Sequence, residues 1–115
     1  MCESPKGTID VQKLLSLLGL ASRARQVIFG TPQICEMLAK NKSTPNYPLL
    51  VIEASDTSDN THKRIGDKCT FYGVKHVRIE CDGATLAHAL GKSSSLAAVA
   101  LTDENFCRLA EKQIF

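Results

Sequence analysis

The sequence contains no tryptophan and few other aromatic residues, with two tyrosines and four phenylalanines in a chain of 115 residues. Its core must therefore be built from Leu, Val, Ile and Ala. Hydrophobic residues make up 43% of the chain, which is ordinary for a soluble domain. A chain of this length suits one domain, and we expect residues 9–115 to form it behind a frayed tail of residues 1–8.

Long apolar runs are also missing. None approaches the roughly 20 residues that a membrane helix needs. Residues 1–9 have no apolar stretch followed by a small-residue cleavage site, so we expect no signal peptide. These absences predict a cytoplasmic protein without a membrane partner. The formal net charge of +2 is mildly basic and is compatible with a nucleic-acid partner.

Paired cysteine motifs are absent. The chain has five cysteines, an odd number, and no two are spaced as C-x-x-C. This pattern argues against a disulfide framework and against a structural zinc site. We therefore expect reduced thiols and no metal or other cofactor, with four of the five packing as small apolar side chains: Cys2, Cys35, Cys69, Cys81 and Cys107.

Motifs for catalysis are missing as well. The sequence has no G-x-S-x-G, no Walker loop and no G-x-G-x-x-G after a strand. Gly91-Lys92-Ser93 resembles the end of a phosphate loop, but it lacks the upstream glycine and follows a predicted helix. The remaining candidate is a nucleophile pair of Cys69 with His62 or His76. A buried thiol and solvated histidines explain these residues equally simply, so we expect no enzyme.

Other ionisable residues have structural explanations. The third histidine, His88, falls on a different predicted element from the other two, and no pair has metal-ligand spacing on one helix face. Asp56 and Asp59 lie in a polar turn before a helix. Carboxylates there satisfy free backbone N–H groups and the helix dipole, so a catalytic carboxylate pair is not needed to explain them.

Hydrophobic periodicity predicts alternating helices and strands. Apolar residues recur at helical spacing after Asp10, whereas residues 49–52 are a continuous apolar run typical of a buried strand. Glycines and capping residues mark the boundaries. The resulting order is helices at about 10–21, 31–41, 61–72, 82–90 and 103–110, with strands at 27–29, 49–52, 74–81 and 96–101. This order predicts an α/β protein, a three-layer α/β/α sandwich around a mostly four-stranded mixed sheet.

Three segments could together bind phosphate groups. Arg23 and Arg25 precede a short strand, and Gly30 lies at a helix N-terminus, where unpaired N–H groups attract anions. A distant loop after Gly91 adds one lysine, small hydroxyls and free backbone amides. In an alternating fold these segments can share one edge of the sheet. With the family resemblance given below, the residues expected to contact RNA are Arg23, Arg25, Gly30, Thr31, Gln33, Gly91, Lys92, Ser93, Ser94, Ser95 and Leu96.

Several separated stretches, in order, resemble one family. They are residues 17–24, 49–61, 67–74, 86–93 and 98–106, within a region of about 13 to 110. They are similar to the bacterial YlxQ-type members of the kink-turn RNA-binding ribosomal-protein superfamily, which includes the large-subunit proteins seven-Ae and thirty-e and has a Gadd45-like fold. The resemblance implies a three-layer α/β/α sandwich and binding of structured RNA, including ribosomal RNA or the ribosome.

The resemblance also implies two binding surfaces. The family's G-x-N-E-x-x-K motif falls on residues 30–36, and a late loop at residues 91–97 packs against an extruded nucleotide. Pro32, Gln33 and Glu36 replace the family's Asn, Glu and Lys. Arg25 stands where YlxQ-type proteins have glycine. These departures keep a second hypothesis open, a protein-interaction or dimerisation module that has lost kink-turn recognition and exposes apolar side chains near Ile28, Phe29 and Leu96.

Overall fold

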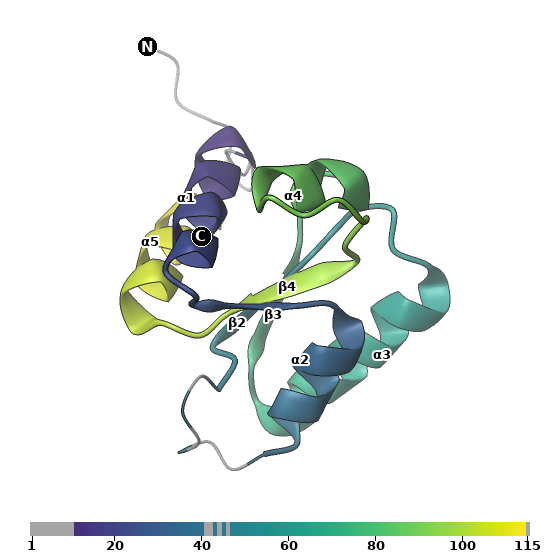
Figure 1. Ribbon diagram of the computed structural model, residues 1–115. Coiled ribbons are helices and arrows are strands. Elements are labelled where there is room, and N and C mark those ends of the chain that lie inside the picture. Colours follow the sequence, from purple (N-terminus) through teal and green to yellow (C-terminus); the bar gives the residue numbers. More distant parts are fainter. Residues whose placement is uncertain (1–10, 41–42, 44, 46, 115) are drawn as a thin grey trace.

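A computed structural model describes residues 11–40, 43, 45 and 47–114 of the chain (Figure 1). Helices and strands alternate along it, as the periodicity predicted. The elements are α1 (Val11–Arg23), β1 (Val27–Phe29), α2 (Thr31–Leu38), β2 (Leu50–Glu53), α3 (Asp59–Tyr72), β3 (Lys75–Arg78), α4 (Gly83–Ala89), β4 (Ala98–Leu101) and α5 (Glu104–Ile114). The predicted tail at residues 1–8, Cys2, the Asp10 cap and the Asn41 helix end lie outside the described residues.

The four strands form one mixed sheet in the order β1-β4-β2-β3. β2 and β3 are parallel, whereas β4 runs antiparallel to both β1 and β2. Consequently β1, β2 and β3 all end at the edge of the sheet where β4 begins. At that edge, Glu53 lies opposite Ala98 on one side and Arg78 on the other. We call it the Gly30 edge, because Gly30 follows β1 there.

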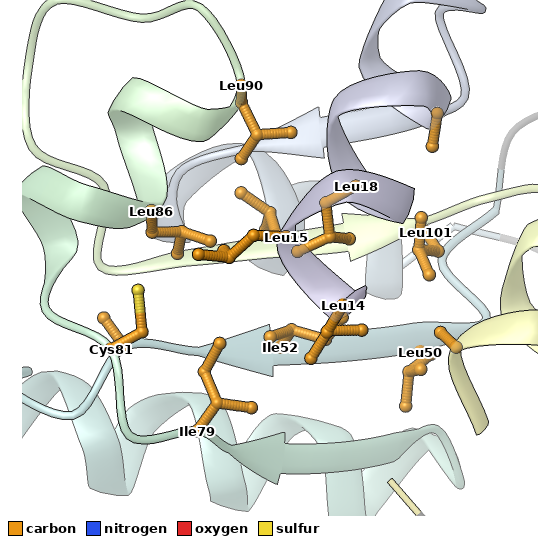
Figure 2. Packing of buried hydrophobic residues seen from close by; sticks show 14 of the residues in the cluster. Leu14, Leu15, Leu18, Leu50, Ile52, Ile79, Cys81, Leu86, Leu90 and Leu101 are labelled. Carbon is orange, nitrogen blue, oxygen red and sulfur yellow. The ribbon is translucent and has the colours of Figure 1, made fainter. Parts of the chain in front are cut away.

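Helices cover both faces of the sheet, which confirms the predicted three-layer sandwich. Helices α1, α4 and α5 pack on one face, over a core that includes Leu14, Leu18, Ile52 and Leu101 (Figures 1 and 2). Helices α2 and α3 cover the other face, over a smaller core around Ile34, Leu38, Val51, Ile65 and Ala100. Within the described part of the chain, no helix is long and apolar enough to cross a membrane.

Two strands are shorter than the alternation predicted. β3 ends at Arg78, because its partner β2 ends at Glu53. Beyond that point the chain bends. The Ile79 amide donates to the Glu53 carbonyl, and the Ser55 amide donates to the Cys81 carbonyl. β4 begins at Ala98, whereas the prediction began it at residue 96. In contrast, β2 extends one residue further than predicted and takes in Glu53.

Short polar side chains and glycine fix the helix ends. Asp82 caps α4 by accepting from the Thr85 amide at 2.7 Å, and hydrogen bonding lowers the pKa of this carboxyl. Gly91 ends α4 with φ of 76°, and the Lys92 amide donates to Ala87 O. Asp56 differs from the expectation, because its carboxylate accepts from the Gly83 amide of α4 and does not cap α3.

The four described cysteines are buried free thiols, as predicted: Cys35, Cys69, Cys81 and Cys107. Removal from water disfavours a thiolate. Burial raises the pKa of Cys69 to about 11, and burial together with the Glu111 carboxylate raises that of Cys107 to about 11. Both thiols therefore remain protonated at neutral pH and act as packing groups.

These raised pKa values predict a loss of stability in alkali. Between about pH 9 and 11 the folded protein keeps the Cys69 and Cys107 protons, whereas the unfolded chain releases them. The contribution of these two thiols to the free energy of unfolding should be constant below this window and should fall as the pH rises through it. Urea denaturation under reducing conditions at pH 7.5, 9 and 10 measures the fall. In Cys69→Ala the dependence on pH should be shallower, and an unchanged slope would contradict the assignment.

Two helical glycines should respond oppositely to a methyl group. A Cβ on Gly83 would meet Ser95 Oγ and lie 2.7 Å from Leu96 O, so Gly83→Ala should push this loop away and cost about 1–3 kcal/mol. On Gly66 in α3 the nearest group would be the His76 ring at 3.9 Å, so Gly66→Ala should stabilise the protein by about 1 kcal/mol. Thermal melts of both variants against wild type decide the signs, and equal shifts would contradict the packing.

Candidate functional site

The two segments that were predicted to share an edge of the sheet lie together at the Gly30 edge. The Gly30 amide donates to Ala98 O at 3.0 Å, which joins the start of α2 to the end of the 91–97 loop. Lys92, near the start of that loop, places its Nζ 4.2 Å from the centroid of the Phe29 ring. These contacts come from residues more than 60 positions apart in the chain, and they form one continuous surface from α2 to the loop.

The N-terminus of α2 has no side-chain cap. Gly30 occupies the cap position with φ of 87° and ψ of 148°, a conformation essentially restricted to glycine. Its carbonyl accepts from Ile34, but Pro32 in the first turn has no N–H to offer. Thr31 is buried, and its hydroxyl oxygen has no hydrogen-bond partner among the described residues. Gln33 is exposed.

The 91–97 loop is anchored at its C-terminal end, and the residues before that end are exposed. The Leu96 amide donates to Gly83 O at 3.1 Å, and Ala97 O accepts from the Ala54 amide at 2.8 Å. The Thr57 hydroxyl is 3.3 Å from Ala97 O and reinforces this end. Leu96 is half-buried against the larger core, whereas the loop's other predicted contact residues are exposed to solvent: Gly91, Lys92, Ser93, Ser94 and Ser95.

Arg23 lies beside the start of this loop. It is the last residue of α1, and the preceding Ser22 hydroxyl donates to Leu90 O at 3.4 Å. The Arg23 side chain is exposed and lines a groove of about 550 Å³ between α1 and α4, together with His88 and Thr85. The structure thus brings Arg23 near Gly91, as the sequence predicted.

Arg25 lies elsewhere. It adopts a left-handed conformation with φ of 61° and forms the turn that ends α1, in which Gln26 N donates to Ala21 O. The next residue, Gln26, is bonded to Thr102 beyond the end of β4. The turn is therefore at the opposite end of β1 from Gly30, and the length of that strand separates Arg25 from Gly30 and the start of α2.

A polar cluster that the sequence did not reveal lies at the same edge, on the face that α3 covers. Glu53 of β2 is completely buried, and its carboxylate contacts His62 Nδ1 at 2.8 Å and His76 Nε2 at 2.7 Å. The expectation of a solvated histidine is wrong for His76, whose side chain is only 17% exposed, whereas that of His62 is 43% exposed. These three residues, the Glu53 cluster, are the one His/Cys/Asp/Glu group of metal-binding geometry in the described ranges.

The Glu53 cluster also argues against a Cys69 nucleophile. Both candidate histidines direct a ring nitrogen at Glu53, and the pKa of the Cys69 thiol is raised to about 11. An acid in the middle of an otherwise apolar segment, residues 49–54, was the signal that could have located the cluster, because an ionised carboxylate is rarely buried without partners.

The apolar residues expected on the surface are partly covered. Ile28 packs against the smaller core, and Phe29 and Leu96 pack against the larger one. Among the described residues, the large hydrophobic side chains that are exposed are instead Leu20, Phe71 and Leu109. Leu20 and Leu109 lie across a shallow groove between α1 and α5, on a different part of the surface from Gly30.

Curated relatives match most of the chain. The RNA-binding protein YlxQ of Bacillus subtilis (strain 168) is 36% identical over 90 residues, which cover 78% of this chain and 83% of the relative. The RNA-binding protein YlxQ of Enterococcus faecium is 27% identical over 103 residues, covering 90% and 92%. The resemblance found in the sequence is thereby confirmed.

Solved structures share the fold. A protein of unknown function from Bacillus halodurans superposes with a TM-score of 0.76 at 32% identity, covering 89% of this chain and 96% of that one. The 15.5 kD RNA binding protein of Giardia lamblia superposes with a TM-score of 0.71 at 18% identity, covering 90% and 83%. The second likeness concerns the fold alone.

The model of one family spans nearly all the elements described above, from α1 to α5, and matches residues 12–110. With the alternating order, the mixed four-stranded sheet and the YlxQ relatives, this match shows that the chain belongs to the ribosomal protein L7Ae/L30e/S12e/Gadd45 family.

Proposed function

We propose that the protein binds structured RNA of the kink-turn type through the Gly30 edge, with ribosomal RNA as one expected target. The observation that carries the proposal is the junction of the α2 N-terminus with the 91–97 loop, through the Gly30–Ala98 hydrogen bond and the Lys92–Phe29 contact. The curated YlxQ relatives, which are named RNA-binding proteins, support it.

The α2 N-terminus is the proposed centre of the surface. Its free amides and partial positive charge favour a phosphate group. The glycine at position 30 leaves no side chain between the backbone and a ligand, and no side chain caps the helix there. Gln33 supplies an exposed amide for contact with a base edge.

Cations and the 91–97 loop form the rim of the surface. Lys92 and Arg23 lie on the side of α4 and α1, and we assign them to phosphate groups. The three exposed serines offer hydroxyls to the RNA backbone, and Leu96 supports an unstacked base. Arg25 would engage phosphate only on RNA that continues along β1, since its turn lies at the far end of that strand.

The departures from the family motif predict altered reading of the RNA. Pro32 cannot donate a hydrogen bond to a guanine edge, and Glu36 brings a negative charge one turn further along α2. Specificity for one sequence should therefore be weak, whereas recognition of shape through backbone amides and phosphates should persist. The proposed activity is binding without catalysis.

Binding to a kink-turn RNA should be electrostatic and should depend on Lys92. With about four phosphates neutralised, log K should fall against log salt with a slope of about −3. Lys92→Gln should weaken binding and reduce that slope by about one, while Lys92→Arg should retain both. Filter-binding titrations at several salt concentrations provide the measurement.

The matched control is Arg108→Gln. Arg108 is exposed on α5 and lies beside Lys75, at the end of the sheet opposite Gly30, so its loss should leave affinity and slope unchanged. Equal losses in Lys92→Gln and Arg108→Gln would indicate non-specific attraction. Affinity for the kink-turn RNA no higher than for an unstructured RNA of equal length would refute the proposal.

Arg25→Gly separates stability from binding. Glycine adopts φ of 61° without strain, so the variant should be more stable than wild type by about 1 kcal/mol. Loss of the guanidinium should weaken binding to an RNA long enough to follow β1 and leave a minimal kink-turn unaffected. Urea denaturation and the same binding titration measure the two effects. A variant that is less stable than wild type would show that the Arg25 side chain holds the turn.

A further inference from the structure

The Glu53 cluster unites three elements and three nitrogen or oxygen donors at one point. Glu53 comes from the end of β2, His62 from the first turn of α3 and His76 from β3. The parallel pairing of β2 and β3 sets His76 opposite Val51, two residues before Glu53, so the two side chains share one face of the sheet. The three ligand atoms lie within 4.8 Å of one another.

The cluster is buried at Glu53 and His76 and open to solvent at His62. The Glu53 side chain is 0% exposed and that of His76 17%, whereas the side chain of His62 is 43% exposed. A buried carboxylate is costly without compensating charge. A cation can reach this one from the His62 side, and the remaining coordination positions would face water there.

We propose that Glu53, His62 and His76 bind one zinc ion. Two imidazoles and one carboxylate form a ligand set that Zn²⁺ favours, with at least one position left for water. Mg²⁺ and Ca²⁺ prefer oxygen donors throughout, so two of the three ligands here do not suit them. The ion would tie α3 to the two strands beneath it.

The two carboxylate oxygens differ in their contacts. His76 reaches Oε1 at 2.7 Å, whereas His62 lies 2.8 Å from both oxygens. Oε2 lies 3.6 Å from Arg78 Nε, and the same guanidinium donates to the Ser55 and Thr57 carbonyls. Oε1 is therefore the metal ligand, and Arg78 stays on Oε2, where it orients the carboxylate as outer partners of metal ligands do.

Zinc entry requires a small expansion of the cluster. Distances of 2.7–2.8 Å between Glu53 and the two rings are those of hydrogen bonds. Ligand atoms placed about 2.0–2.2 Å from a tetrahedral zinc ion lie roughly 3.4 Å apart. The exposed His62 side chain can recede by this amount. The metal replaces the ring protons that now face Glu53, so zinc binding releases protons if the histidines were charged.

Calorimetric titration of the metal-free full-length chain with Zn²⁺ tests the site. We expect one saturable zinc per chain, with affinity lowered at least tenfold in His62→Gln and in Glu53→Gln. His88→Gln is the matched control, because His88 is exposed on α4 outside the cluster, and its affinity should remain within twofold of wild type. Absence of saturable binding, or equal affinity in wild type and His62→Gln, would overturn the proposal.

Two further measurements keep the test independent of folding and of the cysteines. His62 is partly exposed, so metal-free His62→Gln should melt close to wild type, and zinc should raise the melting temperature of wild type alone. Co²⁺ in place of zinc should give visible bands of a nitrogen- and oxygen-ligated ion without a thiolate charge-transfer band. A thiolate band that persists in His62→Gln would place the metal on cysteine and exclude the Glu53 cluster.

Discussion

The position of β4 in the middle of the sheet is the constraint on which the rest of the structure depends. It pairs with β1 on one side and β2 on the other, both antiparallel, so its first residues are held between the ends of two strands. Gly30 bonds to Ala98, and Ala54 bonds to Ala97. The 91–97 loop, the start of α2 and the end of β2 are therefore fixed relative to one another by backbone hydrogen bonds, whatever side chains they carry.

The order and type of the elements could be predicted, because they depend on short-range patterns. Helical spacing in residues 11–23, the apolar run at residues 49–52 and the caps at Asp82, Gly91 and Asp103 are each legible within a few positions. Strand ends were predicted less well. β3 stops where β2 stops, and the sequence of β3 itself, with Ile79 and Cys81 continuing the alternation, gives no sign of it.

The same contrast between short-range patterns and long-range contacts applies to the candidate sites. Gly30 and the 91–97 loop could be linked in advance, since strands that alternate with helices bring such segments to one edge. Arg25 was placed at the wrong end of β1, although its position before the strand and that of Gly30 after it already put the two at opposite ends. The Glu53 cluster, by contrast, could not be placed from the sequence. Its members have no informative spacing along the chain, and only the parallel register of β2 and β3 and the approach of α3 bring them together.

The α2 N-terminus has polar groups without a protein partner in the described part of the chain, and these groups bear on the proposed binding of RNA. A buried hydroxyl without a partner costs about 1–3 kcal/mol, and Thr31 has none among the described residues. Serine or aspartate at position 30 would cap the helix, but the φ of 87° there favours glycine. Pro32 removes one donor from the same turn. The chain thus leaves this helix end without a side-chain cap, so an anionic oxygen bound there would accept from backbone N–H groups that no side chain satisfies.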